Sequence, residues 1–295
     1  MKIVSLLPAA TEIVCSLGLR DQLVGRSHEC DFPADVAELP ALTRARVDSS
    51  LPSDQLDEGV RRVFHAGLPL YELDTARLAE LAPDVVVTQE ACEVCAVSYD
   101  QVMGSLREAS CPARVVSLKP ARLDHILADV RRVAEACAAP GRGAAVVADL
   151  QARLARTRSE TQGSRPRVAV IEWLAPPMLA AHWIPDTIEA AGGVSVGPPA
   201  GEPSPYATWD EIRALSPDAA IVAPCGFDLV RTVSEATFLS ATLRGLAPRV
   251  LLMDGNAYLN RPGPRIVEAA ETIAAWLRGE PVPAARAAEL SRSAE

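Results

Sequence analysis

The sequence predicts an α/β protein built from two Rossmann-like lobes that a long rigid helix joins. Three observations predict this fold class. Residues 78–88 (LAELAPDVVVT) and 212–224 (IRALSPDAAIVAP) share one order of a helix end, a Pro-Asp turn and an apolar strand. Each half also opens with a strand that feeds a helix. Between the halves the strand signals stop and helical periodicity replaces them. One continuous doubly wound sheet is the alternative, and the repeated order argues against it.

These signals divide the chain into four parts. We expect an N-terminal lobe at residues 1–120, a helical connector at 121–164 and a C-terminal lobe at 165–280. Each lobe opens with an apolar strand, KIVSL or RVAVI, and closes with another, RVVSL or RVLLM. The remaining residues, 281–295, lack an apolar face, so a flexible tail is expected there.

Two helices form the expected connector. In the first, Ile126, Val130 and Val133 repeat at helical spacing, and an Ala-Pro-Gly break follows. The second covers about residues 143–159 and carries an apolar face. At about 1.5 Å per residue it would be roughly 25 Å long, enough to cross a domain. Both lobes would lean on this helix, and a ligand would bind in the cleft between them.

Composition and charge exclude several classes of protein. The chain has 295 residues, of which 49% are hydrophobic, so it can bury two cores. Its formal net charge of −9 argues against nucleic acid as a partner, since phosphate binding needs a basic surface. No membrane span is expected, because no run of about 18 residues is free of charges and helix breakers.

The start of the chain and its cysteine count both predict a cytoplasmic protein. Met1-Lys2 runs directly into a strand, without the basic start, apolar core and cleavage site of an export signal. Cysteine occurs 7 times, an odd number that suits a reducing compartment in which thiols need not pair.

Candidate ligand contacts of the N-terminal lobe follow its strands. Ser5 and Thr11 flank the turn between the first strand and its helix, where a hydroxyl could face a ligand or simply cap the helix. His28 lies on the loop after the second strand, in the run SHECDFP, and Glu90 follows the strand at 84–88. Open α/β sheets bind ligands at this edge, so His28 and Glu90 are candidates too.

The same loops carry a candidate metal site. Cys92 and Cys95 form a CxxC motif just after Glu90, and His28 and Cys30 lie on the neighbouring loop. Four such donors suit zinc, cobalt or an iron–sulfur cluster better than calcium or magnesium. A redox pair of the two CxxC thiols and a pair of ordinary cysteines are the alternatives.

Aromatic side chains follow the first strand of the C-terminal lobe. Trp173, His182 and Trp183 lie on one loop, and aromatic faces beside an imidazole suit a flat, largely apolar ligand. Trp183 could instead be a staple for the next helix. Tyr206, in the run PSPYATW, is expected on a surface loop near the cleft.

A polar loop follows the last strand of this lobe. Asn256, Tyr258 and Arg261 offer amide, phenol and guanidinium groups to a ligand with carboxamide or phosphate edges. A loop that only caps the next helix, with Pro262 and Pro264 fixing the path of the chain, is the alternative.

Together these loops resemble those of the solute-binding proteins that serve cobalamin and ferric-siderophore ABC importers, above all the cobalamin-binding branch. The resemblance covers nearly the whole chain and rests on KIVSLLPAATEIVCSLGL, Asp31-Phe32-Pro33, LAELAPDVVVT, EWLAPPMLAAHW and NAYLNRPGPRIVEA, in the expected order. It implies the class III solute-binding fold, also called the helical-backbone metal receptor fold. It further implies a corrinoid held edge-on in the cleft between the lobes.

Two functions compete on these patterns. The first is a non-catalytic, cytoplasmic cobalamin-binding protein, whose docking to an ABC permease the missing export signal argues against. The second is a cytosolic protein or enzyme that depends on a metal or an iron–sulfur cluster held by His28, Cys30, Cys92 and Cys95. A Ser-His-Asp hydrolase is disfavoured because the sequence has no GxSxG motif.

Overall fold

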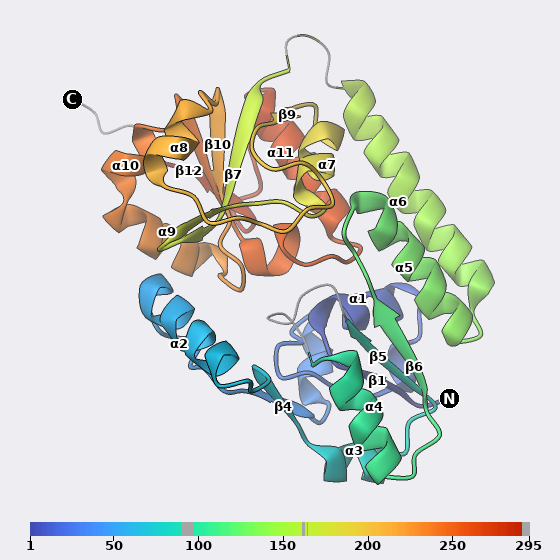
Figure 1. Cartoon of the computed structure of the whole chain (residues 1–295). Helices are drawn as coiled ribbons and strands as arrows, with labels where there is room; N and C mark the ends of the chain where they lie inside the picture. The colour runs from blue at the N-terminus through green and yellow to red at the C-terminus, as the bar shows by residue number, and fades with distance from the viewer. Residues whose placement is uncertain (90–96, 161–162, 164, 291–295) are drawn as a thin grey trace. The chain divides into compact units, whose positions relative to one another are not determined.

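The computed structural model describes residues 1–89, 97–160, 163 and 165–290 of the chain. Their contacts form two compact units. The N-terminal unit comprises Met1–Leu51, Gln55–Pro120 and Asp124–Asp149, and the C-terminal unit comprises Pro52–Asp54, Ala121–Leu123 and Leu150–Glu295. Each unit has its own mainly parallel sheet and its own helices (Figure 1). The fold class is therefore α/β with two sheets, as predicted.

A parallel sheet of four strands forms the centre of the N-terminal unit. Its order is β2-β1-β5-β6, with β1 at Ile3–Ser5, β2 at Leu23–Arg26, β5 at Val85–Gln89 and β6 at Arg114–Leu118. β1 and β5 are buried along their whole length. Strands that are covered on both faces consist of continuous apolar runs, and the VVV of β5 is such a run.

Three helices connect these strands, α1 Pro8–Ser16, α3 Thr75–Leu81 and α4 Tyr99–Glu108, with short 3-10 turns at Arg20–Gln22 and Ala34–Glu38. A fourth helix, α5 Leu123–Ala136, follows β6. Asp74 caps α3 by accepting the backbone N–H of Arg77 at 2.8 Å. The segment between β2 and α3 holds the helix α2 (Ser53–His65) and a small antiparallel sheet of β3 (Thr43–Ala45) and β4 (Tyr71–Leu73).

The sheet of the C-terminal unit is mixed. Its order is β12-β11-β10-β7-β8, and β9 pairs with the start of β7. The strands are β7 Arg167–Leu174, β8 Pro177–Leu179, β9 Val194–Ser195, β10 Ala219–Val222, β11 Arg249–Met253 and β12 Ala287–Glu289. β7, β10 and β11 run parallel, whereas β8 and β12 are antiparallel to their neighbours. The carboxyl ends of the three parallel strands therefore meet at one edge.

Five helices and one π-helical turn accompany this sheet among the described residues: α7 Ile184–Ala190, α8 Trp209–Ala214, α9 Leu229–Phe238, α10 Ser240–Arg244, α11 Ile266–Leu277 and the turn at Gly255–Leu259. Thr208 and Glu211 form a capping box at the start of α8. A core of aliphatic side chains from β7, β10 and β11 includes Ile171, Val222 and Leu252, all at most 2% exposed.

The end of the chain differs from the expected flexible tail at 281–295. Ala287–Glu289 forms β12, which pairs with Leu251–Met253 of β11, and the N–H of Leu290 donates to the carbonyl of Val250 at 2.9 Å. The segment has no apolar periodicity because it lies at the edge of the sheet. Its stability there comes from backbone hydrogen bonds, which leave little trace in the side chains.

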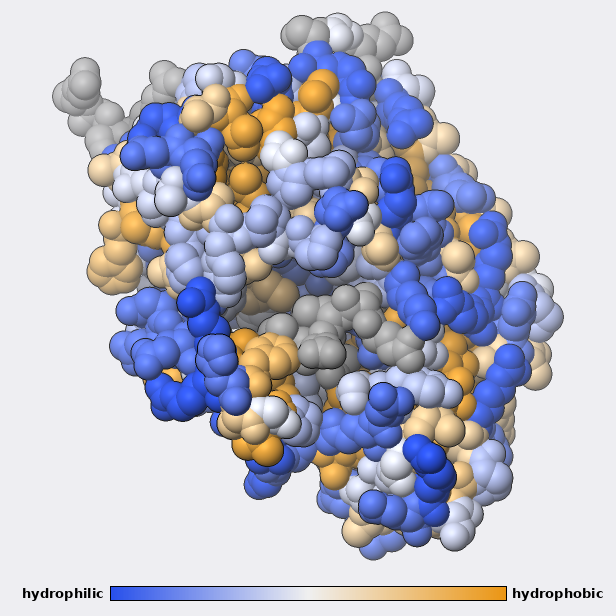
Figure 2. Space-filling model, in the orientation of Figure 1, coloured by the Kyte–Doolittle hydropathy of each residue, from blue (hydrophilic) through white to orange (hydrophobic). Residues whose placement is uncertain are grey.

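The connector is helical, as expected. Its second helix, α6, spans Pro140–Glu160, 21 residues or about 31 Å. Gly143 packs against α5, where an added Cβ would lie 2.4 Å from that of Ala134. Towards its other end, Arg153 makes two hydrogen bonds, at 2.8 and 2.7 Å, to the carboxylate of Glu271 in α11. The exposed residues of α6 mix charged side chains with alanines, and Figure 2 shows hydrophilic and apolar patches interspersed along it.

No helix among the described residues combines the length and the apolar character that crossing a membrane requires.

Candidate functional site

The carboxyl ends of the parallel strands are where a fold of this kind binds ligands. In the N-terminal unit they carry the loops after β1, β2 and β5. The described residues of these loops are 6–7, 27–42 and 97–98. Glu90, Cys92 and Cys95 lie outside the part of the chain that the structure describes. The predictions for these three side chains therefore stay predictions.

Three polar side chains near the ends of β1 and β2 make their contacts inside the N-terminal unit. Ser5 and Thr11 are fully buried and Cys30 is 2% exposed. The Thr11 hydroxyl oxygen lies 2.8 Å from that of Ser5 and 3.0 Å from the Cys30 sulfur, and Ser5 donates to the carbonyl of Leu7 at 3.0 Å. In this structure the two hydroxyls do not reach the surface, in contrast to the expected ligand contacts.

His28 stands at the centre of a polar cluster at the end of β2. Its Nδ1 lies 2.7 Å from the hydroxyl oxygen of Thr43, and its backbone N–H donates to the same oxygen at 3.0 Å. The Nε2 atom is 3.9 Å from the carboxylate of Glu29, which accepts a hydrogen bond from the Tyr71 phenol at 3.1 Å. Thr43 and Tyr71 belong to β3 and β4, so the small antiparallel sheet positions this cluster.

Arg26 fixes the backbone of this loop and affects the charge of His28. Its guanidinium donates to the carbonyls of Ser27 at 2.9 Å and His28 at 3.2 Å. Burial, and secondly the positive charge of Arg26, lower the pKa of His28 from its usual value of 6.5. His28 is therefore neutral at pH 7.

The expected metal site is not assembled by the residues described. Within them, no three His, Cys, Asp or Glu side chains gather closely enough to hold an ion. Cys30 turns into the unit towards Thr11, whereas the His28 ring contacts Thr43 and Tyr71, with ring centroids 5.6 Å apart in the second pair. Two loop positions only two apart thus have different surroundings, which sequence spacing alone does not reveal.

In the C-terminal unit, hydrogen bonds join the three loops at the carboxyl edge. The N–H of Cys225, after β10, donates to the carbonyl of Glu172 in β7 at 2.9 Å. The N–H of Asn256, after β11, donates to the carbonyl of Phe227 at 3.0 Å. Gly255 makes the second contact possible, since a Cβ there would lie 2.3 Å from the carbonyl oxygen of Pro224. The edge is thus one connected surface.

A tilted pair of aromatic rings lies on this edge. The rings of Trp173 and Phe227 are 5.2 Å apart between centroids, and the guanidinium carbon of Arg231 is 3.5 Å from the centroid of Phe227. Phe227 is buried, whereas Trp173 is only half-buried. Part of the Trp173 indole is therefore accessible on a rigid support.

The other two aromatic candidates of the first loop have different surroundings. Trp183 is 9% exposed, and its indole N–H donates to the carbonyl of Leu259 at 2.9 Å. This geometry fits the alternative role of Trp183, in which its side chain anchors the start of the next helix and does not contact a ligand. His182 stacks on Trp183 with centroids 5.8 Å apart, and burial lowers the pKa of its imidazole. Tyr206 is 50% exposed and its backbone pairs with that of Met178.

The loop after β11 places its polar residues in a turn capped by Asp254, which accepts the N–H of Ala257 at 2.7 Å. Arg261 is 4% exposed and donates to the side-chain oxygen of Asn256 at 3.2 Å. The Tyr258 ring contacts two guanidinium groups, with the carbons of Arg265 and Arg286 at 5.2 and 5.3 Å from its centroid. The three predicted residues thus share one loop, each held by cations or hydrogen bonds.

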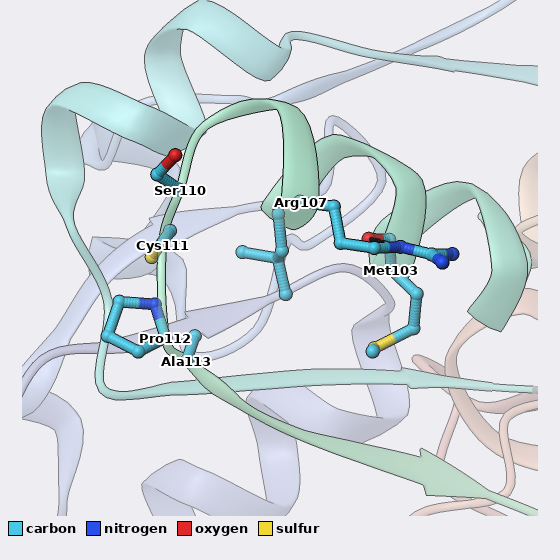
Figure 3. Close-up of a pocket in the computed structure, with 7 residues that line it drawn as sticks. Met103, Arg107, Ser110, Cys111, Pro112 and Ala113 are labelled. Atoms are coloured by element: carbon cyan, nitrogen blue, oxygen red, sulfur yellow. Dashed lines mark hydrogen bonds between the residues drawn. The ribbon is translucent and has the colours of Figure 1, made fainter.

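A hollow elsewhere in the N-terminal unit is not a candidate. It measures about 330 Å³ and lies beside the residues that precede β6, at the amino edge of the sheet (Figure 3). The residues that line it are Met103, Leu106, Arg107, Ser110, Cys111, Pro112 and Ala113. Its one charged group, Arg107, is directed back to the carbonyl of Met103, to which it donates at 3.1 Å.

Sequence reasoning missed four residues of these clusters: Thr43, Tyr71, Phe227 and Arg231. The first two lie in strands of three residues, too short to show periodicity. Phe227 and Arg231 had a detectable signal, because an aromatic residue and an arginine four positions apart on a helix start can contact each other.

A fold of two units, each with a mainly parallel sheet, together with a helical connector defines a class III solute-binding protein. The chain belongs to the family described as periplasmic binding protein, whose model matches residues 3–240. It is 20% identical to the vitamin B12-binding protein of Vibrio cholerae over 284 residues, 94% of this chain and 89% of that protein. The resemblance inferred from the loops is thereby confirmed.

Solved structures show the same fold. The periplasmic vitamin B12 binding protein of Vibrio cholerae has a TM-score of 0.68 at 20% identity, with 94% of this chain and 96% of that chain covered. A periplasmic heme-binding protein of Roseiflexus sp. RS-1 also has 0.68, at 22% identity, with 92% and 96% covered. A periplasmic heme-binding protein of Pseudomonas aeruginosa has 0.70 at 18% identity, with 100% and 99% covered.

Proposed function

We propose that this protein binds cobalamin or a related corrinoid without catalysing a reaction. The observation that carries the proposal is the tilted contact of Trp173 with Phe227, whose ring also contacts Arg231, at the carboxyl edge of the C-terminal sheet. The indole of Trp173 is half-buried and contacts Phe227, so its rotamer is already fixed. It therefore offers an apolar surface to a ligand at little further cost in side-chain entropy.

The similar proteins support a ligand of this shape. Relatives and structural neighbours are named for binding vitamin B12 or heme. Both molecules are tetrapyrroles with a large flat ring and polar side chains at its rim. A ring of this kind would lie on Trp173, while Asn256 and Tyr258 would meet its polar edge. Arg261, which is 4% exposed, would position Asn256 by donating to its side-chain oxygen.

The cleft between the lobes, the cytoplasmic location and the relation to an ABC permease stay predictions. Cell fractionation would test the location. We expect that the protein does not dock to an ABC permease, and co-purification with a permease would overturn this expectation.

Titration with cyanocobalamin, followed by calorimetry and by quenching of tryptophan fluorescence, tests the proposal. Trp173→Ala should weaken binding by about 1–3 kcal/mol, the value of a buried aromatic contact. The matched control is Trp209→Ala, since Trp209 is also half-buried but packs against the core of the C-terminal unit. Unchanged affinity in the Trp173 variant, or no corrinoid binding by the unaltered protein, would show that the assignment is wrong.

A further inference from the structure

A line of contacts runs from Trp173, at the carboxyl edge of the C-terminal unit, to the helix α9 (Figure 1). The rings of Trp173 and Phe227 have centroids 5.2 Å apart, and the guanidinium carbon of Arg231 lies 3.5 Å from the Phe227 centroid. Phe227 is 1% exposed, so protein surrounds its ring. In a close-packed interior such a ring moves only if its neighbours move, and Arg231 is one of these neighbours.

Glu235 is one of the groups that fix the position of Arg231. A guanidinium stays over an aromatic ring only when its long side chain keeps one conformation. Glu235 lies one turn after Arg231 on α9, and its Oε1 atom is 3.5 Å from a guanidinium nitrogen of Arg231. The two side chains are only 24% and 20% exposed, so solvent screens this ion pair less than a fully exposed one.

Ser53 in turn fixes the carboxylate of Glu235. Its hydroxyl donates to Oε2 of Glu235, whereas Arg231 lies next to Oε1. Ser53 begins α2, and by its contacts the short stretch Pro52–Asp54 belongs to the C-terminal unit. Ser53 is 2% exposed, and a buried hydroxyl proton needs an acceptor. The hydrogen bond to Glu235 is therefore costly to break, and each oxygen of this carboxylate has its own partner.

We propose that Glu235 and Ser53 are positioning residues of the proposed ligand site. Ser53 orients the carboxylate of Glu235, and Glu235 orients Arg231. Arg231 in turn keeps Phe227 in the place where Trp173 contacts it. Of these five residues only Trp173 touches the ligand. The inference rests on the proposed function and extends its site to two residues that lie outside the loops at the carboxyl edge.

The position of Trp173 is measured first, by NMR of the free protein. The indole N–H of Trp173 donates to the carbonyl of Ala175 at 3.2 Å, and the Phe227 ring lies beside the indole. The chemical shift of this N–H therefore depends on the hydrogen bond and on the place of the neighbouring ring. Trp173→Phe identifies the signal among those of the 4 tryptophans.

We expect the Trp173 signal to shift in Arg231→Ala and, by a smaller amount, in Glu235→Ala. The double variant should match Arg231→Ala alone, because Glu235 acts through Arg231. Asp210→Ala is the matched control, since Asp210 forms an ion pair with Arg213 on α8 of the same unit, and it should leave the signal in place. An unmoved signal in Glu235→Ala, or effects of the two substitutions that simply add, would overturn the inference.

The role of Ser53 is tested in two backgrounds. In the unaltered protein, Ser53→Ala removes the hydroxyl and should shift the Trp173 signal in the same direction as Glu235→Ala. In the Glu235→Ala background the same substitution should add nothing, because the acceptor is already gone. A further shift in that background would show that Ser53 does not act through Glu235.

Affinity for cyanocobalamin is measured second, by calorimetry. Arg231→Ala should weaken binding about threefold to tenfold, the size of a partly buried cation–π contact, and Glu235→Ala and Ser53→Ala by no more than that. Unchanged affinity in all three variants would refute the positioning role and leave the proposed function intact. Failure of the unaltered protein to bind cyanocobalamin would refute the proposed function and, with it, the inference that rests on it.

Discussion

Replacing Asp129 by Asn should remove a pH-dependent part of the stability of the N-terminal unit. Asp129 lies in α5 with its side chain fully buried. Its carboxylate accepts the backbone N–H of Lys119, just beyond β6, at 3.2 Å, and the guanidinium of Arg132 lies 2.8 Å away as an ion pair. Burial raises the pKa of Asp129 from 3.8 to about 6, against the opposing effects of Arg132, the Lys119 N–H and His125.

The sign and size follow from linkage. The folded unit favours protonated Asp129, so the resulting stability is fully present below pH 3.8 and is lost as the pH rises through about 6. The shift of about two pKa units corresponds to about 3 kcal/mol over the whole range. Between pH 7 and pH 5 about 1.3 kcal/mol of this is gained. Arg132 is 42% exposed and stays solvated when Asn replaces its partner.

Urea unfolding at pH 7 and pH 5, followed by hydrogen exchange of β5, measures this difference. The free energy of unfolding of the unaltered protein, minus that of Asp129→Asn, should rise by about 1.3 kcal/mol on going to pH 5. The subtraction matters because the pKa values of His28 and His182 are lowered, and these groups destabilise the fold as the pH falls below 6.5. β10 in the other unit is the internal control. A difference that stays flat, or that falls towards pH 5, would refute the reasoning.

Three further predictions concern the C-terminal unit. Gly255→Ala should destabilise it by about 1–3 kcal/mol in urea unfolding, because the new Cβ would overlap the carbonyl of Pro224; an unchanged midpoint would contradict the close packing. Trp183→Phe should cost about 1–3 kcal/mol of stability by leaving the buried Leu259 carbonyl without its donor, yet leave corrinoid affinity unchanged in calorimetry. Among the cysteines that the structure describes, exposed Cys225 should react first with iodoacetamide in peptide mapping, and slower labelling than at a buried cysteine would speak against its exposure.

The sequence predicted the sheets well because apolar runs and Pro-Asp turns determine them locally. β5 and β10 follow their Pro-Asp turns directly, at Val85–Gln89 and Ala219–Val222. The antiparallel pair of β3 and β4 was missed, because a strand of three partly exposed residues has too few positions to show alternation.

The site was harder to predict than the fold because side-chain direction is set by tertiary packing. Ser5 ends β1 and Thr11 lies in the first turns of α1, near the edge where ligand-binding hydroxyls often occur, but packing inside the N-terminal unit buries both. Cys30 and His28 are two positions apart and still have different neighbours. Conversely, Thr43 reaches His28 only because β3 folds back beside the end of β2, a contact across 15 positions of sequence.

The C-terminal strand β12 has a consequence for handling the protein. It covers the outer side of β11, whose residues RVLLM would otherwise form an open sheet edge with unpaired N–H and C=O groups. Open apolar edges recruit strands from other molecules and begin aggregation. Shortening the chain before Ala287, as a domain boundary at residue 280 would suggest, would uncover this edge and reduce solubility. Affinity tags are accordingly better placed at the other terminus.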